Sequence, residues 1–374
     1  MITALAIAIV ALAPVGVVVW RWRLAQVARL APCPAKAPNA RVSIVIPARD
    51  EAHNLPRLLA SIARLGVRPH EVIVVDDHST DGTGDLARAA GAIVVTPAPL
   101  PPGWLGKSWA CAAGAARATG DHLLFTDADT EHGPASLELA LARATEAELV
   151  SIIPTHRIEA GWERLQGGFQ LMLLVAGRAG ATATRGARRY SIGQYLLFTR
   201  EAYQRLGGHA AVAGQIAEDL HLAAKVVDGG GRFALLHAPG ALGVRMYPEG
   251  LGAFLRGWRR SFRAGMAAAG GGGAAEMIAV VAWLLGVPLG LALAAAAGSA
   301  TWLAIAGAAY LATAAMLARD QRAVARVPWW SALAFPLPVL AFIAVSAAAG
   351  LDHLRGAPVR WRGRTVALPT GSEP

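Results

Sequence analysis

Two carboxylates stand two residues apart in the middle of the chain, Asp127 and Asp129, directly after the apolar run at residues 123–125. In an extended chain such residues point to the same side. A pair of carboxylates on one side suits a hard divalent cation such as Mg²⁺ or Mn²⁺. A cation held in this way can bridge a diphosphate and stabilise the charge that develops on it as it leaves. The pair therefore predicts a site for a metal ion and a diphosphate.

Two more polar clusters follow apolar runs, at residues 42–46 and 71–75. The first run is followed by Pro47, Arg49 and Glu51, and the second by Asp76 and Asp77. An Asp-Gly-Thr sequence such as residues 81–83, taken alone, is usually a turn or a helix cap. Because acidic residues recur after three apolar runs, we expect them to meet at one edge of a sheet.

The segment over residues 41–265 alternates strand and helix signals. Helical patterns at residues 54–65 and 83–90 follow the first two apolar runs, and further short apolar runs lie at residues 92–95, 122–125, 149–153 and 194–198. Near-continuous apolar strands separated by helices indicate an α/β fold with a mostly parallel sheet and helices on both faces. Such sheets bind ligands outside the carboxyl ends of their strands, which is where the three polar clusters lie.

Both ends of the chain are apolar enough to cross a membrane. Residues 1–20 carry no charged side chain, and residues 277–318 are 42 consecutive uncharged residues. As a helix the second stretch would be about 63 Å long, twice a hydrocarbon core of about 30 Å, so it predicts a hairpin of two helices. A third C-terminal run covers residues 327–351.

The expected organisation follows from these segments. It comprises a transmembrane helix over residues 1–22, a Pro-rich linker over 23–40, an α/β domain over 41–265, a Gly-rich linker over 266–276, two to three membrane helices over 277–351 and a basic tail over 352–374.

Charge and composition narrow the class of protein. The chain has 374 residues, 55% of them hydrophobic, a mean hydropathy of +0.42 and a net charge of +10, which excludes an ordinary soluble domain and a disordered protein. Arg21 and Arg23 follow the first apolar run, which argues against a cleaved signal peptide and places the α/β domain in the cytoplasm. If residues 327–351 cross the membrane, the arginines from Arg355 onward lie outside, against the same rule. Pro336 and Pro338 leave a re-entrant or interfacial segment open.

Several motifs occur together in one order and spacing. They are Val42-Ser-Ile-Val-Ile-Pro-Ala-Arg-Asp-Glu51, Val74-Val-Asp-Asp-His-Ser-Thr-Asp-Gly-Thr83, Pro102-Gly-Trp-Leu-Gly-Lys107, Phe125-Thr-Asp-Ala-Asp129, Gly207-Gly-His209, Glu218-Asp219 and Arg245-Met-Tyr-Pro-Glu-Gly250. In these motifs the chain resembles membrane-bound family 2 glycosyltransferases with the GT-A fold. Within them it is similar to the branch that includes the 4,4'-diaponeurosporenoate glycosyltransferases and the hopanoid-associated glycosyltransferases.

The resemblance implies a role for each matching position. The donor would be bound by Pro47, Arg49, Glu51, Asp76, Asp77, Lys107 and Asp127; the metal by Asp127 and Asp129; and Asp219 would be the general base. The acceptor or diphosphate would contact His209, Glu218, Trp258 and Arg259. Many relatives carry Gln-x-x-Arg-Trp at the last of these positions, whereas this chain has Arg256-Gly-Trp-Arg-Arg260, which argues against a processive synthase. The residues themselves leave alternatives open, because Lys107 also suits a solvated loop, His209 a turn, and Glu218 with Asp219 the first turn of a helix.

The activity that the resemblance implies is inverting transfer of a hexose from a nucleotide-diphosphate sugar, with a UDP-sugar expected, to a lipid such as a carotenoid or hopanoid. The cofactor would be Mg²⁺ or Mn²⁺. The partners would be the sugar nucleotide, the lipid and the bilayer of the inner membrane, with no nucleic acid. Two alternatives are transfer to polyprenyl phosphate and a non-catalytic membrane component that binds a nucleotide sugar.

Two other features carry competing interpretations. Residues 82–87 match the form Gly-x-Gly-x-x-Ala of a dinucleotide-binding protein, but six polar residues, 76–81, separate them from the preceding strand. The apolar stretch at residues 162–180 could lie along the membrane surface and deliver a lipid acceptor, or could be a core helix.

Overall fold

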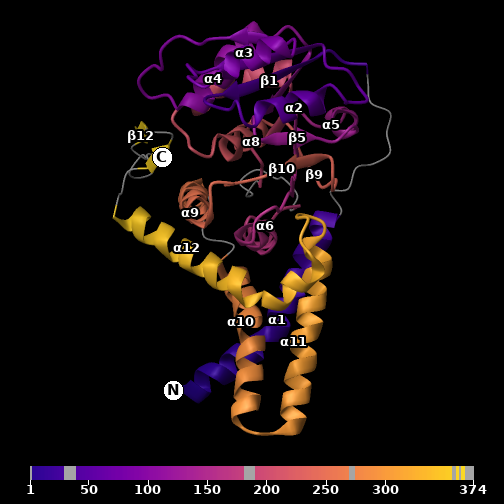
Figure 1. Cartoon of the computed structure of the whole chain (residues 1–374), viewed down its shortest axis with the longest axis vertical. Coiled ribbons are helices and arrows are strands. Elements are labelled where there is room, and N and C mark those ends of the chain that lie inside the picture. The colour runs from indigo at the N-terminus through magenta and orange to yellow at the C-terminus, as the bar shows by residue number, and fades with distance from the viewer. Residues whose placement is uncertain are drawn as a thin grey trace.

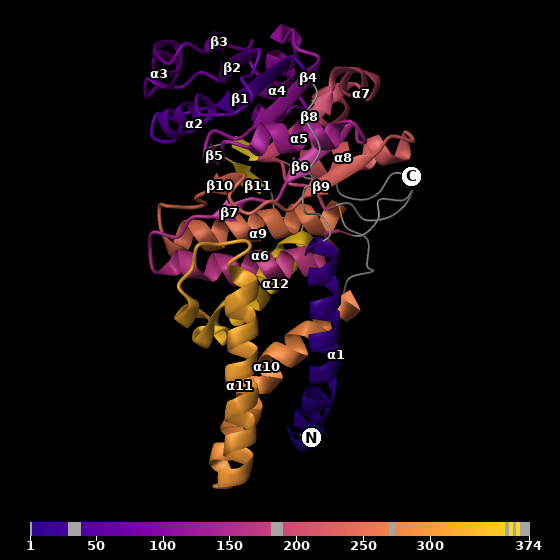
Figure 2. The same cartoon turned by 90° about the vertical axis from the view of Figure 1, so that its right-hand side faces the viewer.

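The computed structural model describes residues 2–28, 39–180, 190–268, 274–355, 359–361 and 364–366. An α/β domain lies at one end of the molecule, and long helices extend from it at the other (Figure 1). Two shorter helices run between these parts, across the direction of the long ones (Figure 2).

A seven-stranded sheet in the order β3-β2-β1-β4-β8-β6-β9 forms the centre of the α/β domain. The strands are β1 (Val42–Ala48), β2 (Glu71–Asp76), β3 (Ile93–Val95), β4 (His122–Thr126), β6 (Leu149–Ile152), β8 (Tyr195–Thr199) and β9 (Phe233–Leu236). Neighbouring strands are parallel except for β8, which runs antiparallel to β4 and to β6. The predicted α/β class with a mostly parallel sheet is therefore confirmed.

Helices cover both faces of the sheet because alternate residues of each inner strand point to opposite sides. On one face lie α2 (Leu55–Ile62), α3 (Thr83–Ala89) and α5 (Ser136–Ala144), packed with Ile44 and Ile46 of β1. On the other lie α4 (Gly106–Arg117), α7 (Arg200–Arg205) and α8 (Glu218–Asp228), packed with Val45. This double cover explains why β1 reads as an almost unbroken apolar run.

A small second sheet extends the domain toward the long helices. Its order is β5 (Thr130–His132), β10 (Leu242–Val244) and β7 (Thr155–His156). Next to it run α6 (Leu165–Ala176), which follows the short 3₁₀ turn η1 (Trp162–Arg164), and α9 (Leu251–Ala268). A second 3₁₀ turn, η2 (Gly208–Val212), lies between α7 and α8. Phe169 and Val175 of α6 are fully buried, which supports the core-helix alternative for this stretch.

Three long helices form the far end of the molecule: α1 (Ile2–Ala28), α10 (Ala274–Ala296) and α11 (Ala300–Gln321). Helices α1 and α10 touch closely at Gly16, where an added Cβ would lie 2.3 Å from the Ala279 carbonyl oxygen. Beyond α11 come the 3₁₀ turn η4 (Trp329–Ala334), α12 (Pro336–Leu354) and the strands β11 (Val359–Trp361) and β12 (Arg364–Val366). By length and composition α10, α11 and α12 are each able to cross a membrane.

The predicted segment boundaries compare with these elements as follows. The first helix continues to Ala28, past the predicted end at residue 22, and residues 29–38 of the Pro-rich linker lie outside the described residues. Residues 269–273 of the Gly-rich linker also lie outside them.

Candidate active site

The loops after β1 and β2 are joined by hydrogen bonds at the carboxyl edge of the sheet. The backbone N–H of Thr80 donates to Asp50 Oδ1 at 2.8 Å, and that of Ala52 donates to Asp81 Oδ2 at 2.9 Å. Asp50 adopts a left-handed backbone conformation with φ of 53°. The carboxylate of Asp76 accepts from the N–H of Ser79 at 3.0 Å, which is a local turn contact. These carboxylates hold the shape of the two loops.

Arg49 and Asp77 form the polar pair that these loops present. Arg49 Nη1 lies 3.3 Å from Asp77 Oδ2, and the Asp77 side chain is only 8% exposed. The N–H of Asp77 also donates to the Ala48 carbonyl at 2.8 Å, so β1 and β2 fix its position. A carboxylate held in this way beside a guanidinium can accept hydrogen bonds from a ribose or a base. The predicted nucleoside-binding residues Arg49 and Asp77 therefore lie together.

Lys107 connects two acidic clusters that are far apart in sequence. Its Nζ lies 2.7 Å from Asp127 Oδ1, after β4, and 2.9 Å from Glu218 Oε1, in the first turn of α8. It also donates to the Gly193 carbonyl at 3.3 Å. Burial would lower the pKa of Lys107, but Asp127 and Glu218 outweigh it and raise this pKa well above its usual value. Lys107 is thus a charged residue of the site, not a solvated loop lysine.

Asp129 has the features expected of a metal ligand. Its Oδ1 is buried and accepts no hydrogen bond within the part of the chain that the structure describes. Burial, with the negative charges of Asp127 and Glu51, raises the pKa of Asp129 to about 7, against an opposing effect of Lys107. A cation beside this oxygen would stabilise the ionised form.

The described residues do not supply a full coordination shell. No group of three or more His, Cys, Asp or Glu side chains among them is placed to hold a metal ion. Beside a nucleotide, Mg²⁺ is commonly bound by one or two carboxylates, and phosphate oxygens and water fill the remaining coordination positions. Asp127 and Asp129 therefore fit a divalent cation that arrives with its substrate.

Asp219 neighbours this cluster at the start of α8. Burial and the adjacent charge of Glu218 raise the pKa of Asp219 to about 7, while Lys107 lowers it. A carboxylate with a pKa near neutrality is a suitable general base. The acidic pair therefore does more than begin a helix. Glu218 forms an ion pair with Lys107, and the charges of both residues shift the pKa of Asp219.

Three neighbours of the site were not predicted from the sequence. Gly193 leaves little space, since an added Cβ would lie 3.2 Å from Glu218 Oε1 and 3.3 Å from Lys107 Nζ. Tyr190 accepts from Gln170 Nε2 at 3.3 Å, and the charge of Asp219 adds to burial in raising its pKa. Tyr247 has φ of 58°, and its pKa is raised by burial and by Asp129. Of the three, only Tyr247 could have been found from the sequence, because it lies within the Arg245–Gly250 motif.

Three residues assigned to the acceptor or diphosphate make their contacts within the protein. His209 is 1% exposed, its Nδ1 lies 2.9 Å from the Tyr203 hydroxyl, and burial together with the charge of Lys107 lowers its pKa to about 3. Trp258 is 5% exposed and donates to Gln166 Oε1 at 3.1 Å. Arg259 pairs with Asp352 of α12. His209 and Trp258 therefore belong to the core, and Arg259 joins two helices.

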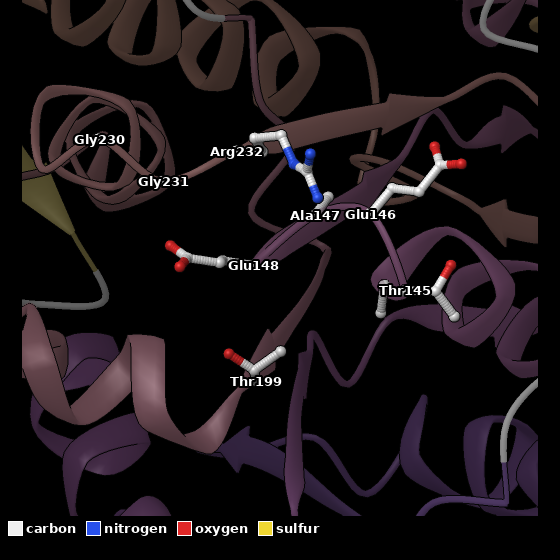
Figure 3. A pocket seen from close by; sticks show the side chains of 9 residues that line it. Thr145, Glu146, Ala147, Glu148, Thr199, Gly230, Gly231 and Arg232 are labelled. Carbon is white, nitrogen blue, oxygen red and sulfur yellow. The ribbon is translucent and has the colours of Figure 1, made fainter.

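A separate polar cavity of about 370 Å³ is lined by residues that include Glu146, Glu148 and Arg232 (Figure 3). These residues precede β6 and β9, so the cavity lies at the amino ends of those parallel strands. Asp127 and Asp77 follow the carboxyl ends of β4 and β2. The cavity is therefore not part of the site.

The chain is similar to known glycosyltransferases. Residues 43–207 match the model of the family described as glycosyl transferase family 2. The chain is 30% identical over 259 residues to a 4,4'-diaponeurosporenoate glycosyltransferase of Staphylococcus haemolyticus and 32% identical over 251 residues to one of Staphylococcus aureus. Each alignment covers 66% of this chain and 66% of the relative.

A solved structure resembles almost the whole chain. It is the mannosyltransferase PcManGT from Pyrobaculum calidifontis in complex with GDP-Man and Mn²⁺, with a TM-score of 0.57 and 22% identity. The likeness covers 93% of this chain and 99% of that one. It establishes the GT-A fold for this chain, as the sequence predicted.

Proposed function

Because this chain belongs to glycosyltransferase family 2, we propose that it transfers a hexose from a nucleotide-diphosphate sugar to a lipid acceptor, with inversion at the anomeric carbon. The observation that carries the proposal is the convergence of Asp127, Asp129, Glu218 and Asp219 around Lys107. These residues come from two segments about 90 positions apart, at the end of β4 and the start of α8. A fold-stabilising role alone does not require two carboxylates with raised pKa values at one sheet edge.

The two halves of the site suit the two substrates. Arg49 and Asp77 provide a polar pair for the nucleoside, and the Asp127 and Asp129 carboxylates suit the diphosphate end. Asp219 lies in the first turn of α8. Lys107 links this turn to Asp127 through its ion pairs with Glu218 and Asp127. The acceptor would therefore approach from α8 and the donor from the sheet.

The reaction is a single displacement. The acceptor oxygen forms a bond to the anomeric carbon while the bond from that carbon to the diphosphate oxygen breaks, and the electron pair leaves with the diphosphate. Asp219 accepts the proton of a hydroxyl acceptor, a role commonly worth roughly 10²- to 10⁴-fold in rate. Lys107 places a positive charge next to Asp127, where it can also stabilise the departing diphosphate.

A divalent cation bound by Asp127 and Asp129 would supply Lewis-acid stabilisation of the leaving diphosphate. Two features support this: the charge of Asp127 and the buried oxygen of Asp129, which accepts no hydrogen bond from the described residues. The Mn²⁺ bound together with GDP-Man in the mannosyltransferase structure agrees with it.

We place the site on the cytoplasmic side of the inner membrane. The arginines Arg21 and Arg23 end the first helix next to the α/β domain, as the positive-inside rule expects of a cytoplasmic side. A lipid acceptor fits a site attached to three long apolar helices. The relatives' name denotes a carotenoid carboxylate, which makes such an acid the first acceptor to test.

The test compares acceptors that differ in ionisation. Membranes carrying the wild-type protein or Asp219→Asn are incubated with labelled UDP-glucose and GDP-mannose, Mn²⁺ and either a hydroxylated lipid or a carotenoid carboxylate, and the products are identified by mass spectrometry. We expect Asp219→Asn to abolish transfer to the hydroxyl but to retain appreciable transfer to the carboxylate, which is already ionised at pH 7.

Asp85→Asn is the matched control, because Asp85 is an 87% exposed aspartate of α3 that pairs only locally, with Arg88. It should behave as wild type on both acceptors. Full activity of Asp219→Asn on the hydroxyl would remove the base role from Asp219. Donor binding without transfer to any lipid would favour a non-catalytic component.

A further inference from the structure

Polar contacts join the helices α1, α10 and α11 at one level, close to the α/β domain. Arg23 of α1 donates to Glu276 near the start of α10 at 2.6 and 2.7 Å, and Trp20 donates to Asp320 near the end of α11 at 2.9 Å. From Glu276 to Ala296 the helix measures about 30 Å, the thickness of a hydrocarbon core. Charged residues therefore mark the membrane surface nearest the α/β domain, and α10 and α11 have the length to reach the other surface.

Helix α12 does not start at either surface. Just before it, the Leu333 carbonyl accepts from the Tyr310 hydroxyl at 2.5 Å, and the Phe335 ring lies 4.9 Å from the Tyr310 ring. Tyr310 precedes Asp320 by ten residues of α11, a rise of about 15 Å. The chain therefore enters α12 at roughly half the depth of the hydrocarbon core.

The other end of α12 returns to the α/β domain. Asp352 accepts two hydrogen bonds from Arg259 of α9, and the Phe342 ring lies 4.9 Å from that of Phe262. Both figures show α9 against the α/β domain, and Figure 1 shows α12 rising obliquely toward it instead of running alongside α10 and α11.

The side chains leading into α12 change in the order expected for descent into a bilayer. Arg322 and Arg326 are exposed, followed by Trp329 and Trp330, which are 63% and 47% exposed. Further along the chain, at the start of α12, Leu337 is 61% exposed. Arginine at the phosphate level, tryptophan at the interface and leucine beyond is the usual sequence of residues from water to hydrocarbon.

We infer that residues 327–354 form a re-entrant element, which enters the leaflet next to the α/β domain and leaves on the same side. Its exposed face, with Trp329, Trp330 and Leu337, is a surface for the acyl chains of that one leaflet. This explains the arginines that follow α12, since Arg355 then lies on the same side as Arg21 and Arg23, as the positive-inside rule expects. The inference rests on the proposed membrane placement, and the test separates the two.

The topology test uses single cysteines in the full chain, in a background with Cys33→Ser and Cys111→Ser that retains activity. The positions are Arg355→Cys after α12, Ala300→Cys at the first residue of α11, next to the turn that follows α10, and Asp85→Cys in the α/β domain, all at exposed residues. A membrane-impermeant maleimide is applied to intact and to permeabilised cells.

We expect Ala300→Cys to label in intact cells, and Asp85→Cys and Arg355→Cys to label only after permeabilisation. Labelling of Arg355→Cys in intact cells together with Ala300→Cys would show that α12 crosses, and would overturn the re-entrant element alone. Labelling of Ala300→Cys only after permeabilisation would instead overturn the membrane placement of the hairpin.

A depth measurement separates a re-entrant element from one that lies on the surface. Spin labels at Leu337→Cys and Arg326→Cys are compared in vesicles by their collisions with oxygen, which enriches in hydrocarbon, and with a water-soluble nickel chelate. The Leu337 label should collide mainly with oxygen and the Arg326 label mainly with nickel. Equal access of nickel to both labels would overturn the inference.

Discussion

The acid limb of the pH–rate profile should report the ionisation of Asp219, and it should move when Glu218 is neutralised. In the proposed mechanism, transfer to a hydroxyl acceptor needs ionised Asp219, so activity should rise with pH through about 7, the pKa of this carboxyl. The charge of Glu218 is one cause of that raised pKa. Glu218→Gln should therefore shift the acid limb to lower pH.

The size of the shift follows from Coulomb's law. Two neighbouring carboxylates roughly 6 Å apart at an effective dielectric constant of about 20 repel by about 3 kcal/mol, or about two pKa units. Lys107 Nζ lies 2.9 Å from Glu218 Oε1 and cancels part of that charge. We therefore expect a downward shift of about one pH unit in Glu218→Gln.

The assay measures kcat/KM for a hydroxylated lipid between pH 5 and 9 at saturating donor and Mn²⁺. Glu51→Gln is the matched control, because Glu51 contributes to the raised pKa of Asp129, whereas the neighbouring charges that shift Asp219 are those of Glu218 and Lys107. If Glu51→Gln moves the acid limb and Glu218→Gln does not, Asp129 sets the profile and the reasoning is refuted.

Three further substitutions test the rest of the site. Lys107→Met leaves Asp127 and Glu218 without their cation, so the donor KM should rise by roughly tenfold or more and the acid limb should move up in pH; donor titrations and pH profiles would measure both. Asp129→Asn should lower activity at fixed Mn²⁺ on the order of a hundredfold and weaken the Mn²⁺ dependence, unless the carboxylate binds no metal. Gly257→Ala places a Cβ against the Tyr247 ring and should cost about 1–3 kcal/mol in thermal unfolding, whereas Tyr247→Phe, which loses the hydroxyl hydrogen bonds to Ser261 and Arg260, should cost less; equal stability of the two variants would contradict that packing.

The strand ends that hold the carboxylates could be predicted because their signals are local. β1, β2 and β4 are buried on both faces, so they read as apolar runs, and a parallel arrangement brings the residues after them to one edge. Asp77 and Asp127 therefore lie where the sequence placed them. The motifs also identified Lys107, although the sequence could not say which carboxylates it pairs with.

The remaining features depend on tertiary packing that leaves no local pattern. The antiparallel β8 inserts between β4 and β6, and its apolar residues do not encode direction. On α9 successive residues turn by about 100°, so Trp258 faces the core while Arg259 faces Asp352. A motif assigned residue by residue could not distinguish these two directions.

The charges of the site also explain why a donor should need a divalent cation. Four carboxylates lie near Lys107: Asp127, Asp129, Glu218 and Asp219. Lys107 already forms ion pairs with Asp127 and Glu218. A diphosphate that arrived alone would add negative charge next to carboxylates whose charges already raise the pKa values of Asp129 and Asp219. A divalent cation reverses this balance, since it favours ionised Asp129 and attracts the diphosphate. We therefore expect donor affinity to fall with chelation far more steeply in wild type than in Asp129→Asn, as measured by equilibrium binding of labelled donor, and equal sensitivity of the two proteins would contradict this account.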